Sequence, residues 1–185
     1  MKSTDNSDEL FDVVNDKDEV IGQATRGEVH KNKKLIHRSI GVAVFNSKGE
    51  LFLQKRSATK DTDPLLWTIS CSGHVRSGND YDETAIRELK EELALEGELK
   101  HLFKIRYKHP RGCYVFTDLW LMPNPSLIEE KKFDKTEVFE IMLSDFAELK
   151  VSITQNQGMF QPQLRELVHR WRILYGSTAT PNNNR

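Results

Sequence analysis

Residues 73–95 read GHVRSGNDYDETAIRELKEELAL and form the most informative segment of this 185-residue chain. A helix is expected over residues 81–95, because Asp80 is a favourable N-cap and Glu83 follows it three residues later, as in a capping box. The loop before this helix is bounded by Gly73 and Gly78. The segment therefore predicts a glycine-bounded loop that leads into a capped helix.

Two sets of side chains separate on the predicted helix at roughly 100° per residue. Three carboxylates share one arc of about 100°, and they are Glu88, Glu91 and Glu92. The apolar side chains fall on a different face, roughly 140° away, and they are Ile86, Leu89 and Leu93. The pattern predicts that the apolar face docks on a sheet while the carboxylates project together.

Three like charges in one arc repel one another. A hard divalent cation removes this repulsion, because Mg²⁺ prefers carboxylate oxygens and keeps water ligands for a phosphate substrate. Arg87 lies one turn from Glu91 and is placed to orient it. The alternative is an ordinary solvated helix face, which the charge pattern taken alone favours.

The segment resembles the Nudix box, G-x5-E-x7-R-E-U-x-E-E-x-G-U, in which U is apolar. Seven positions fall in register: Gly73, Arg87, Glu88, Leu89, Glu91, Glu92 and Leu95. Asn79 replaces the first Glu of the box, which bears on loop geometry and activity level more than on the metal site. Ala94 replaces the late Gly and predicts a helix that ends without a left-handed cap.

The resemblance implies the fold and the chemistry of that family. The expected fold is the Nudix α/β/α sandwich with a mixed sheet and a short N-terminal extension. The expected cofactor is Mg²⁺, with Mn²⁺ as an alternative, and its implied ligands are the Gly73 carbonyl, Glu88, Glu91 and Glu92. The same three carboxylates are the expected catalytic residues, because hydrolysis needs an activated water next to the diphosphate and an acceptor for its proton.

The chain from about Val20 to Leu93 also resembles type 1 isopentenyl-diphosphate isomerases and their hydrolase-like relatives. The landmarks include the FNSKG turn at 45–49, Trp67-Thr68 and Gly73-His74. The resemblance implies that cations bind the substrate, namely Arg26, Arg56 and Lys60, and Arg suits bidentate contact with phosphate. It also matches three histidines to metal ligands and so suggests a second metal site at His30, His37 and His74.

Two features argue against the isomerase reaction itself. The isomerases place a Cys immediately before the Gly-His pair, whereas this chain has Ser72 there and Cys71 one residue earlier. One step along a strand turns a side chain to the opposite face, so Cys71 is expected in the core. The glutamate pair of the isomerase metal site has no evident counterpart, although Asp118 could offer one carboxylate.

The rest of the chain predicts a single α/β domain over residues 9–176, after a disordered lead-in at 1–8 and before a flexible tail at 177–185. Hairpins are expected at 11–21 and 39–54, and Thr25 with Glu28 predicts a capping box for a short helix. Further strands are expected at 65–70, 102–107, 114–122 and 137–143. Further helices are expected from Ser144 through Leu149 and after Pro162.

The charge balance is nearly neutral, with 27 Lys and Arg against 28 Asp and Glu. This argues against a protein that coats nucleic acid or an anionic membrane. No stretch approaches the roughly 18 apolar residues of a membrane span, and the polar N-terminus has no apolar signal core. The two cysteines, Cys71 and Cys113, exclude a disulfide framework and favour a reducing cytoplasm.

Three functions follow from these features, and they share a small diphosphate compound as partner. The first is a Mg-dependent hydrolase that cleaves a diphosphate linkage in a nucleoside-diphosphate-type or related compound. The second is isopentenyl-diphosphate Delta-isomerase, and the third is a non-catalytic Nudix-fold binding module, which Asn79 and Ala94 favour. The carboxylate-rich helix favours the hydrolase, and the oligomeric state stays unknown.

Overall fold

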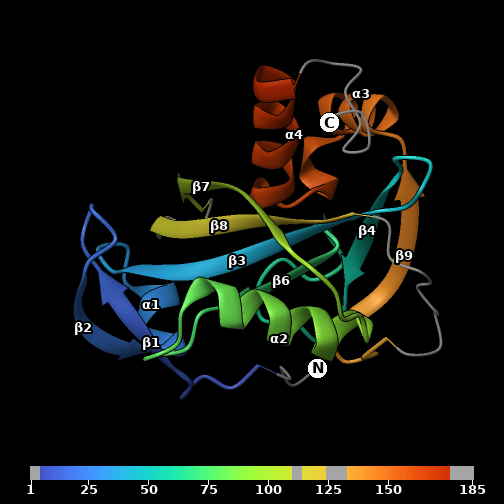
Figure 1. The fold of residues 1–185 in the computed structure, drawn as a ribbon. Coiled ribbons are helices and arrows are strands. Elements are labelled where there is room, and N and C mark those ends of the chain that lie inside the picture. Colours follow the sequence, from blue (N-terminus) through green and yellow to red (C-terminus); the bar gives the residue numbers. More distant parts are fainter. Residues whose placement is uncertain (1–4, 110–113, 124–132, 176–185) are drawn as a thin grey trace.

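The computed structural model describes residues 5–109, 114–123 and 133–175 (Figure 1). Its strands are β1 (Leu10–Val14), β2 (Val20–Thr25), β3 (Ile36–Phe45), β4 (Leu51–Arg56), β5 (Trp67–Thr68), β6 (Cys71–His74), β7 (Lys100–Lys108), β8 (Tyr114–Pro123) and β9 (Val138–Ser144). Its helices are α1 (Arg26–Lys31), α2 (Tyr81–Leu93), α3 (Phe146–Gln155), a short 3-10 helix (Gln157–Met159) and α4 (Pro162–Tyr175).

One mixed sheet forms the middle layer of the molecule. At its centre β3 runs parallel to β8, with Ile36 opposite Tyr114, and antiparallel to β6, with Ile40 opposite Gly73. The strand β7 pairs with β8, and β4 pairs with both β5 and β9. The strands β1 and β2 form a hairpin that joins β3 at Val14. The predicted mixed sheet is therefore confirmed.

Helices cover both faces of this sheet (Figure 1). The core under α2 takes Ala85, Leu89 and Leu93 from that helix. The core on the opposite face takes Leu149 from α3 and Leu164 and Trp171 from α4. The strand β3 serves both cores, because successive side chains of a strand point to opposite faces. This three-layer arrangement confirms the predicted α/β/α sandwich. In the described part of the chain, none of the helices has the length and apolar character that crossing a bilayer requires.

The N-terminal hairpin and α1 form a small third core with Phe11, Val13 and Val29. Thr25 caps α1, since its hydroxyl accepts a hydrogen bond from the Glu28 N–H and the Glu28 carboxylate accepts one from the Thr25 N–H. The predicted capping box is thus confirmed. Arg26 and His30 of this helix contact His74 of β6.

Several local expectations differ from the structure. Asp145 caps α3 in place of Ser144, because its carboxylate accepts from two N–H groups, and the helix continues past Leu149 to Gln155. The strand predicted at 65–70 is limited to Trp67–Thr68, because Leu65 has a φ of 61°, outside the strand region. Within the predicted lead-in, the Asp5 carboxylate pairs with Arg26 and Lys60. Residues 1–4, Cys113 and the predicted tail at 177–185 lie outside the described residues.

The end of α2 also differs from the prediction. Ala94 has φ 52° and ψ 34°, which is the left-handed conformation. The sequence predicted no left-handed cap here, because Ala replaces Gly at this position. This conformation costs an L-residue about 1–2 kcal/mol. The following Leu95 is buried, and its N–H donates to the Leu89 carbonyl at 3.4 Å, so packing and hydrogen bonding after the helix hold Ala94 in place.

Substituting Ala94→Gly should therefore raise the free energy of unfolding by about 1 kcal/mol, because Gly adopts the left-handed conformation without steric cost. Urea unfolding followed by circular dichroism measures this change. Ala147→Gly, at an exposed helical position of α3, is the matched control and should lower stability. A loss of stability in the Ala94 variant would contradict the expectation.

Candidate active site

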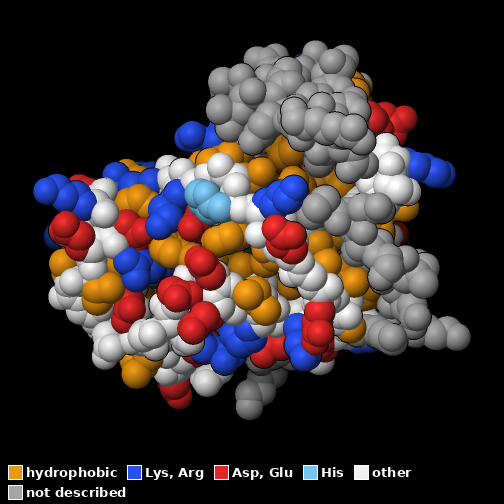
Figure 2. Space-filling view, in the orientation of Figure 1, with side chains coloured by type: hydrophobic (Ala, Val, Ile, Leu, Met, Phe, Trp, Pro, Cys, Tyr) orange, Lys and Arg blue, Asp and Glu red, His pale blue; other side chains and the backbone are white. Residues whose placement is uncertain are grey.

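A cavity of about 240 Å³ opens between α2, the N-terminal hairpin with α1, and the loop after β4. Its acidic lining residues are Asp5, Glu9, Glu88, Glu91, Glu92, Asp134 and Glu137. Its cationic lining residues are Arg26, Arg56, Lys60, Arg76 and Arg87, and its histidines are His30, His37, His74 and His109. Figure 2 shows acidic and basic side chains interleaved on the face that carries α2. The cavity therefore combines most of the predicted site residues in one place.

Glu88 and Glu92 lie in the C-terminal half of α2, on the side of the helix that faces β6. Glu92 is 3% exposed, and its Oε2 accepts hydrogen bonds from Gln54 Nε2 at 3.0 Å and from the Ser72 N–H at 3.4 Å. Glu88 lies directly against Gly73, because a Cβ at residue 73 would be 2.3 Å from the Glu88 Cδ. Only glycine allows the carboxylate to approach the backbone of residue 73 so closely.

Burial shifts the titration of both carboxyls. Burial together with the nearby Glu91 raises the pKa of Glu88 to about 7, although Arg87 opposes the shift. Burial together with Glu88 raises the pKa of Glu92 to about 8, although Gln54 and Arg56 oppose it. Two buried like charges disfavour each other's ionised form. The pair thus holds unfavourable charge that a bound cation would compensate.

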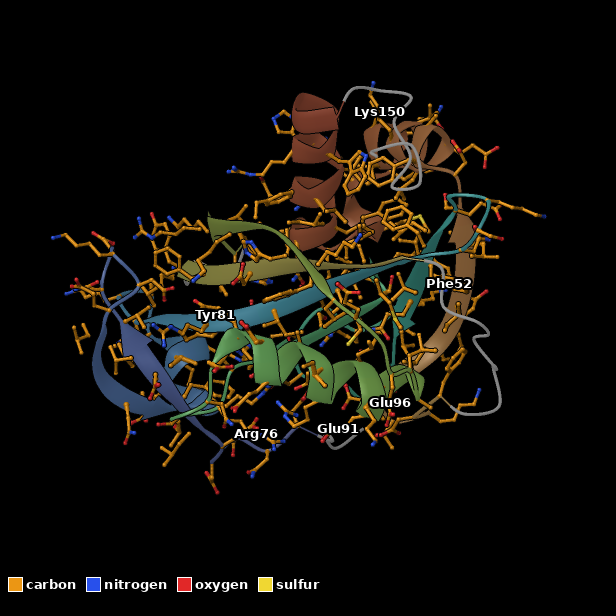
Figure 3. The ribbon with its side chains drawn as sticks, in the orientation of Figure 1. Phe52, Arg76, Tyr81, Glu91, Glu96 and Lys150 are labelled. Atoms are coloured by element: carbon orange, nitrogen blue, oxygen red, sulfur yellow. The ribbon has the colours of Figure 1, made fainter. Side chains whose placement is uncertain are left out.

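Glu91 differs from the other two box carboxylates. Its side chain is 55% exposed and forms an ion pair of 2.9 Å with Arg87, whose other terminal nitrogen is 2.7 Å from Glu88 Oε1. Glu91 and Arg76 lie along the same edge of α2 (Figure 3). The structure therefore brings Glu88 and Glu92 together in the interior and leaves Glu91 at the rim.

The buried face of α2 is rotated from the predicted one. Glu92 belongs to that face, whereas Ile86, expected to dock on the sheet, is 57% exposed. Thr84 and Ala85 are buried on this face in its place. The expectation that Ile86 docks on the sheet is wrong, whereas Glu88, Glu91 and Glu92 do project together into one cavity.

The donor set around Gly73 fits a hard divalent cation. Carboxylate and carbonyl oxygens are the ligands that Mg²⁺ and Mn²⁺ prefer. Glu88 and Glu92 supply buried carboxylates with raised pKa values, and Gly73 supplies backbone within contact of Glu88. These three residues would hold the cation, with Glu91 able to join from the rim.

The three predicted substrate cations differ in their partners. Arg26 contacts Asp61 at 2.9 Å and Asp5 at 3.2 Å. Lys60 contacts Asp5 at 2.6 Å and Glu137 at 2.7 Å. Arg56 is 8% exposed, donates from Nε to the Thr62 carbonyl at 3.1 Å, and forms no ion pair with a carboxylate of the described residues. Arg56 is therefore the cation whose charge is least compensated by the protein.

The three histidines converge at the other end of the cavity. Ring nitrogens of His30, His37 and His74 all lie within 4.8 Å of one another. Burial lowers the pKa of His37 to about 3 and that of His74 well below its ordinary value, so both rings are neutral at pH 7. His37 Nδ1 is buried and has no hydrogen-bond partner among the described residues. The spacing and the neutral rings meet two requirements of a metal site.

The protons of this trio oppose metal binding. Arg26 lies 3.1 Å from His74 Nδ1, and a guanidinium can only donate, so this nitrogen must accept. The proton of neutral His74 then resides on Nε2, which is 3.2 Å from His30 Nε2. A metal ligand needs a lone pair where this proton lies, whereas metal-bound histidines usually donate from their other nitrogen. In this arrangement the trio forms a hydrogen-bonded chain, and the metal site at His30, His37 and His74 stays a prediction.

The isomerase-specific residues are arranged as the sequence suggests. Cys71 is fully buried in the core under α2, while Ser72 lines the cavity. Asp118 pairs with His101 of β7 and lies opposite Ile40 in register, whereas His37 lies opposite Val115. Residues 37 and 40 of β3 point to opposite faces. Asp118 therefore lies on the face away from His37 and cannot complete the histidine trio.

Two cavity features were not predicted from the sequence. His109 Nε2 lies 2.9 Å from Asp63, which also accepts from Gln161 Nε2 at 3.1 Å. Asp5 inserts its carboxylate between Arg26 and Lys60. His109 lies in a basic run and Asp5 in a polar lead-in, so neither carries a local pattern that indicates its place in the fold.

Comparisons with known proteins place these features in context. The family model for the NUDIX domain matches residues 35–170. The chain is 40% identical over 100 residues to isopentenyl-diphosphate Delta-isomerase 2 of Photorhabdus laumondii, which covers 54% of this chain and 56% of that protein. It is 36% identical over 108 residues to an uncharacterized Nudix hydrolase of Streptomyces coelicolor, which covers 57% and 59% respectively. The matched regions thus span less than two thirds of these relatives.

Solved structures share the fold. The crystal structure of DR0079 from Deinococcus radiodurans superposes with a TM-score of 0.73 at 26% identity, covering 88% of this chain and 98% of that one. The MutT protein from Methanosarcina mazei superposes with a TM-score of 0.61 at 16% identity, covering 75% and 94%. These neighbours support the sandwich architecture.

The raised pKa of Glu92 predicts a pH-dependent loss of stability. A carboxyl whose pKa rises from 4.5 to about 8 on folding binds its proton more tightly in the folded state. The free energy of unfolding therefore falls as the pH rises through this window. Glu92→Gln removes the loss, so the stability of the variant relative to wild type should grow from pH 4.5 to pH 8.

Urea unfolding in buffer with chelator, at several pH values across this window, measures the difference. Asp82→Asn, which removes an exposed carboxylate at the other end of the same helix, is the control for the general effect of taking a charge from α2. A stability difference between Glu92→Gln and wild type that is independent of pH would contradict the expected titration.

Proposed function

Because the chain belongs to the Nudix family, we propose that it is a divalent-metal-dependent hydrolase, with Mg²⁺ as the cation, that cleaves a diphosphate linkage in a small nucleoside-diphosphate-type or related compound. Family membership supports an enzyme that acts on a diphosphate. The observation that carries the proposal is the juxtaposition of the half-buried Glu88 and the buried Glu92 with the buried guanidinium of Arg56 in one cavity.

The carboxylates and the guanidinium have complementary roles toward a diphosphate. A cation held by Glu88, Glu92 and the Gly73 carbonyl would neutralise phosphate charge and acidify bound water. Arg56 offers its terminal N–H groups to phosphoryl oxygens, a contact at which Arg forms paired hydrogen bonds. Glu91 and Glu137 line the same cavity and are placed to accept the proton that the attacking water releases.

A second candidate function is isomerisation of isopentenyl diphosphate. The 40% identity to a protein of that name and the clustered histidines favour it. Ser72 in the cavity, the buried Cys71 and the position of Asp118 oppose it. Incubation with isopentenyl diphosphate in deuterated water separates the two, because isomerisation incorporates deuterium into carbon and hydrolysis releases phosphate.

A screen of diphosphate compounds with Mg²⁺ tests the main proposal through release of phosphate or a monophosphate. Glu92→Gln should lower kcat at least about a hundredfold on any compound that the wild type cleaves, because it removes a buried charge that holds the cation. Asp82→Asn, an exposed position of the same helix, should leave turnover unchanged. Full activity of Glu92→Gln would reject this assignment, and binding without any turnover would favour a non-catalytic module.

Arg56→Met should weaken substrate binding without weakening the fold. The variant should raise KM about tenfold or more, because a charge-assisted contact to phosphate contributes about 1.5–3 kcal/mol. Its free energy of unfolding should stay equal or rise, because it removes a buried charge that lacks a carboxylate partner. Lys55→Met on the same strand is the control, since Lys55 pairs with Glu140 away from the cavity. An unchanged KM in Arg56→Met would contradict the role of Arg56.

A further inference from the structure

The carboxylate of Asp5 occupies the cavity as an anionic ligand would. Its Oδ1 lies 2.6 Å from Lys60 Nζ and 3.2 Å from an Arg26 terminal nitrogen, and its Oδ2 accepts from the Asp61 N–H at 2.8 Å. The Asp5 side chain is only 5% exposed. Three donors from α1 and from the loop after β4 therefore converge on one carboxylate that comes from the segment before β1.

This set of donors is an anion cradle in its chemistry. A guanidinium, an ammonium and a backbone N–H are the groups that proteins use to bind phosphoryl oxygens. We name the group formed by Arg26, Lys60 and the Asp61 N–H the Asp5 cradle. A phosphoryl group presents oxygens to such donors in the same way as the carboxylate that now fills the cradle.

The two cations of the cradle, Arg26 and Lys60, each contact another carboxylate besides Asp5. Asp61 pairs with Arg26 at 2.9 Å and Glu137 pairs with Lys60 at 2.7 Å, so each cation already has one carboxylate. Asp5 adds a third carboxylate to two cations. An incoming phosphoryl group would therefore compete with the Asp5 carboxylate for the same two cations.

Arg56 lies next to the cradle but outside it. Its Nε donates to the carbonyl of Thr62, the residue that follows Asp61, so the two anion-binding groups are one residue apart along this loop. The Asp5 carboxylate has no ion pair with Arg56 in the described part of the chain. Arg56 and the cradle line one cavity, so a phosphoryl group bound by Arg56 alone would leave Asp5 in place, whereas a second phosphoryl group bound by Arg26 and Lys60 would meet the Asp5 carboxylate.

We propose that Asp5 determines how the cavity discriminates between ligands with one and with two phosphoryl groups, because the second group can enter the Asp5 cradle only by displacing the Asp5 carboxylate. This inference rests on the proposed function for its substrate class. Asp5 lowers the affinity for diphosphates and has little effect on singly phosphorylated compounds. A residue that merely orients Arg26 and Lys60 would have the opposite effect, because its loss would weaken anion binding.

Calorimetric titration of the full chain with methylphosphonate and with methylenediphosphonate tests the proposal. These ligands carry one and two phosphonyl groups and are not hydrolysed. Metal-free protein in buffer with chelator is used, so the result depends on neither turnover nor the cation. Asp5→Asn keeps the size of the side chain and removes its charge. It should bind methylenediphosphonate about tenfold more tightly than wild type, the effect of one charge-assisted contact, and methylphosphonate nearly unchanged.

Asp8→Asn is the matched control, because Asp8 lies in the same segment and is exposed. Asp5→Asn combined with Lys60→Met should lose the gain, since the cradle then lacks its ammonium. Weaker binding in Asp5→Asn, an equal gain for both ligands, no measurable binding by this variant, or the same gain in Asp8→Asn would each overturn the proposal. A failure of the hydrolase assignment would leave these binding constants unaffected, so the two outcomes are distinguishable.

Discussion

The packing of Glu88 and Glu92 between α2 and β6 is the constraint on which the rest of the site depends. Two carboxylates are removed from water at a place where only Gly73 allows backbone and side chain to meet. Burial of ionisable groups of this kind is unfavourable unless it is compensated. The apolar contacts of Ala85, Leu89 and Leu93 hold the helix against the sheet in spite of that cost.

The cations of the cavity differ in the groups that they contact. Arg87 braces the carboxylates of its own helix, and Arg26 and Lys60 are engaged with acids from other segments. Arg56 alone among the described cations of the cavity makes its hydrogen bond to a backbone carbonyl. The other cations of the cavity are therefore paired with carboxylates, and Arg56 is not paired with one among the described residues.

The sequence allowed the layers of the fold to be predicted, because hydrophobic spacing and capping residues act locally. Asp80, Thr25 and the apolar residues of α4 indicated helices that the structure contains. The rotation of α2 was not predictable, since Ile86 is as apolar as its buried neighbours and tertiary contacts decide which residues the sheet covers. The same holds for Ala94, whose left-handed conformation depends on the burial of Leu95. The residue types of the candidate site were identified, but their partners were not. Asp5 and Asp61 are distant from Arg26 in the sequence, and only the folded chain brings them into contact with it.

The parallel pairing of β3 with β8 has a consequence for how the protein acquires its cavity. The hydroxyls of Ser39 and Thr117 on these strands form a hydrogen bond, although the two residues are 78 positions apart in the sequence. His37 and Ser39 of β3 both line the cavity. Contacts between residues so distant in sequence require the closure of a long loop and form slowly. The central strand therefore cannot present its cavity residues until most of the chain has been synthesised and collapsed. Formation of the cavity is expected to coincide with the last, cooperative step of folding.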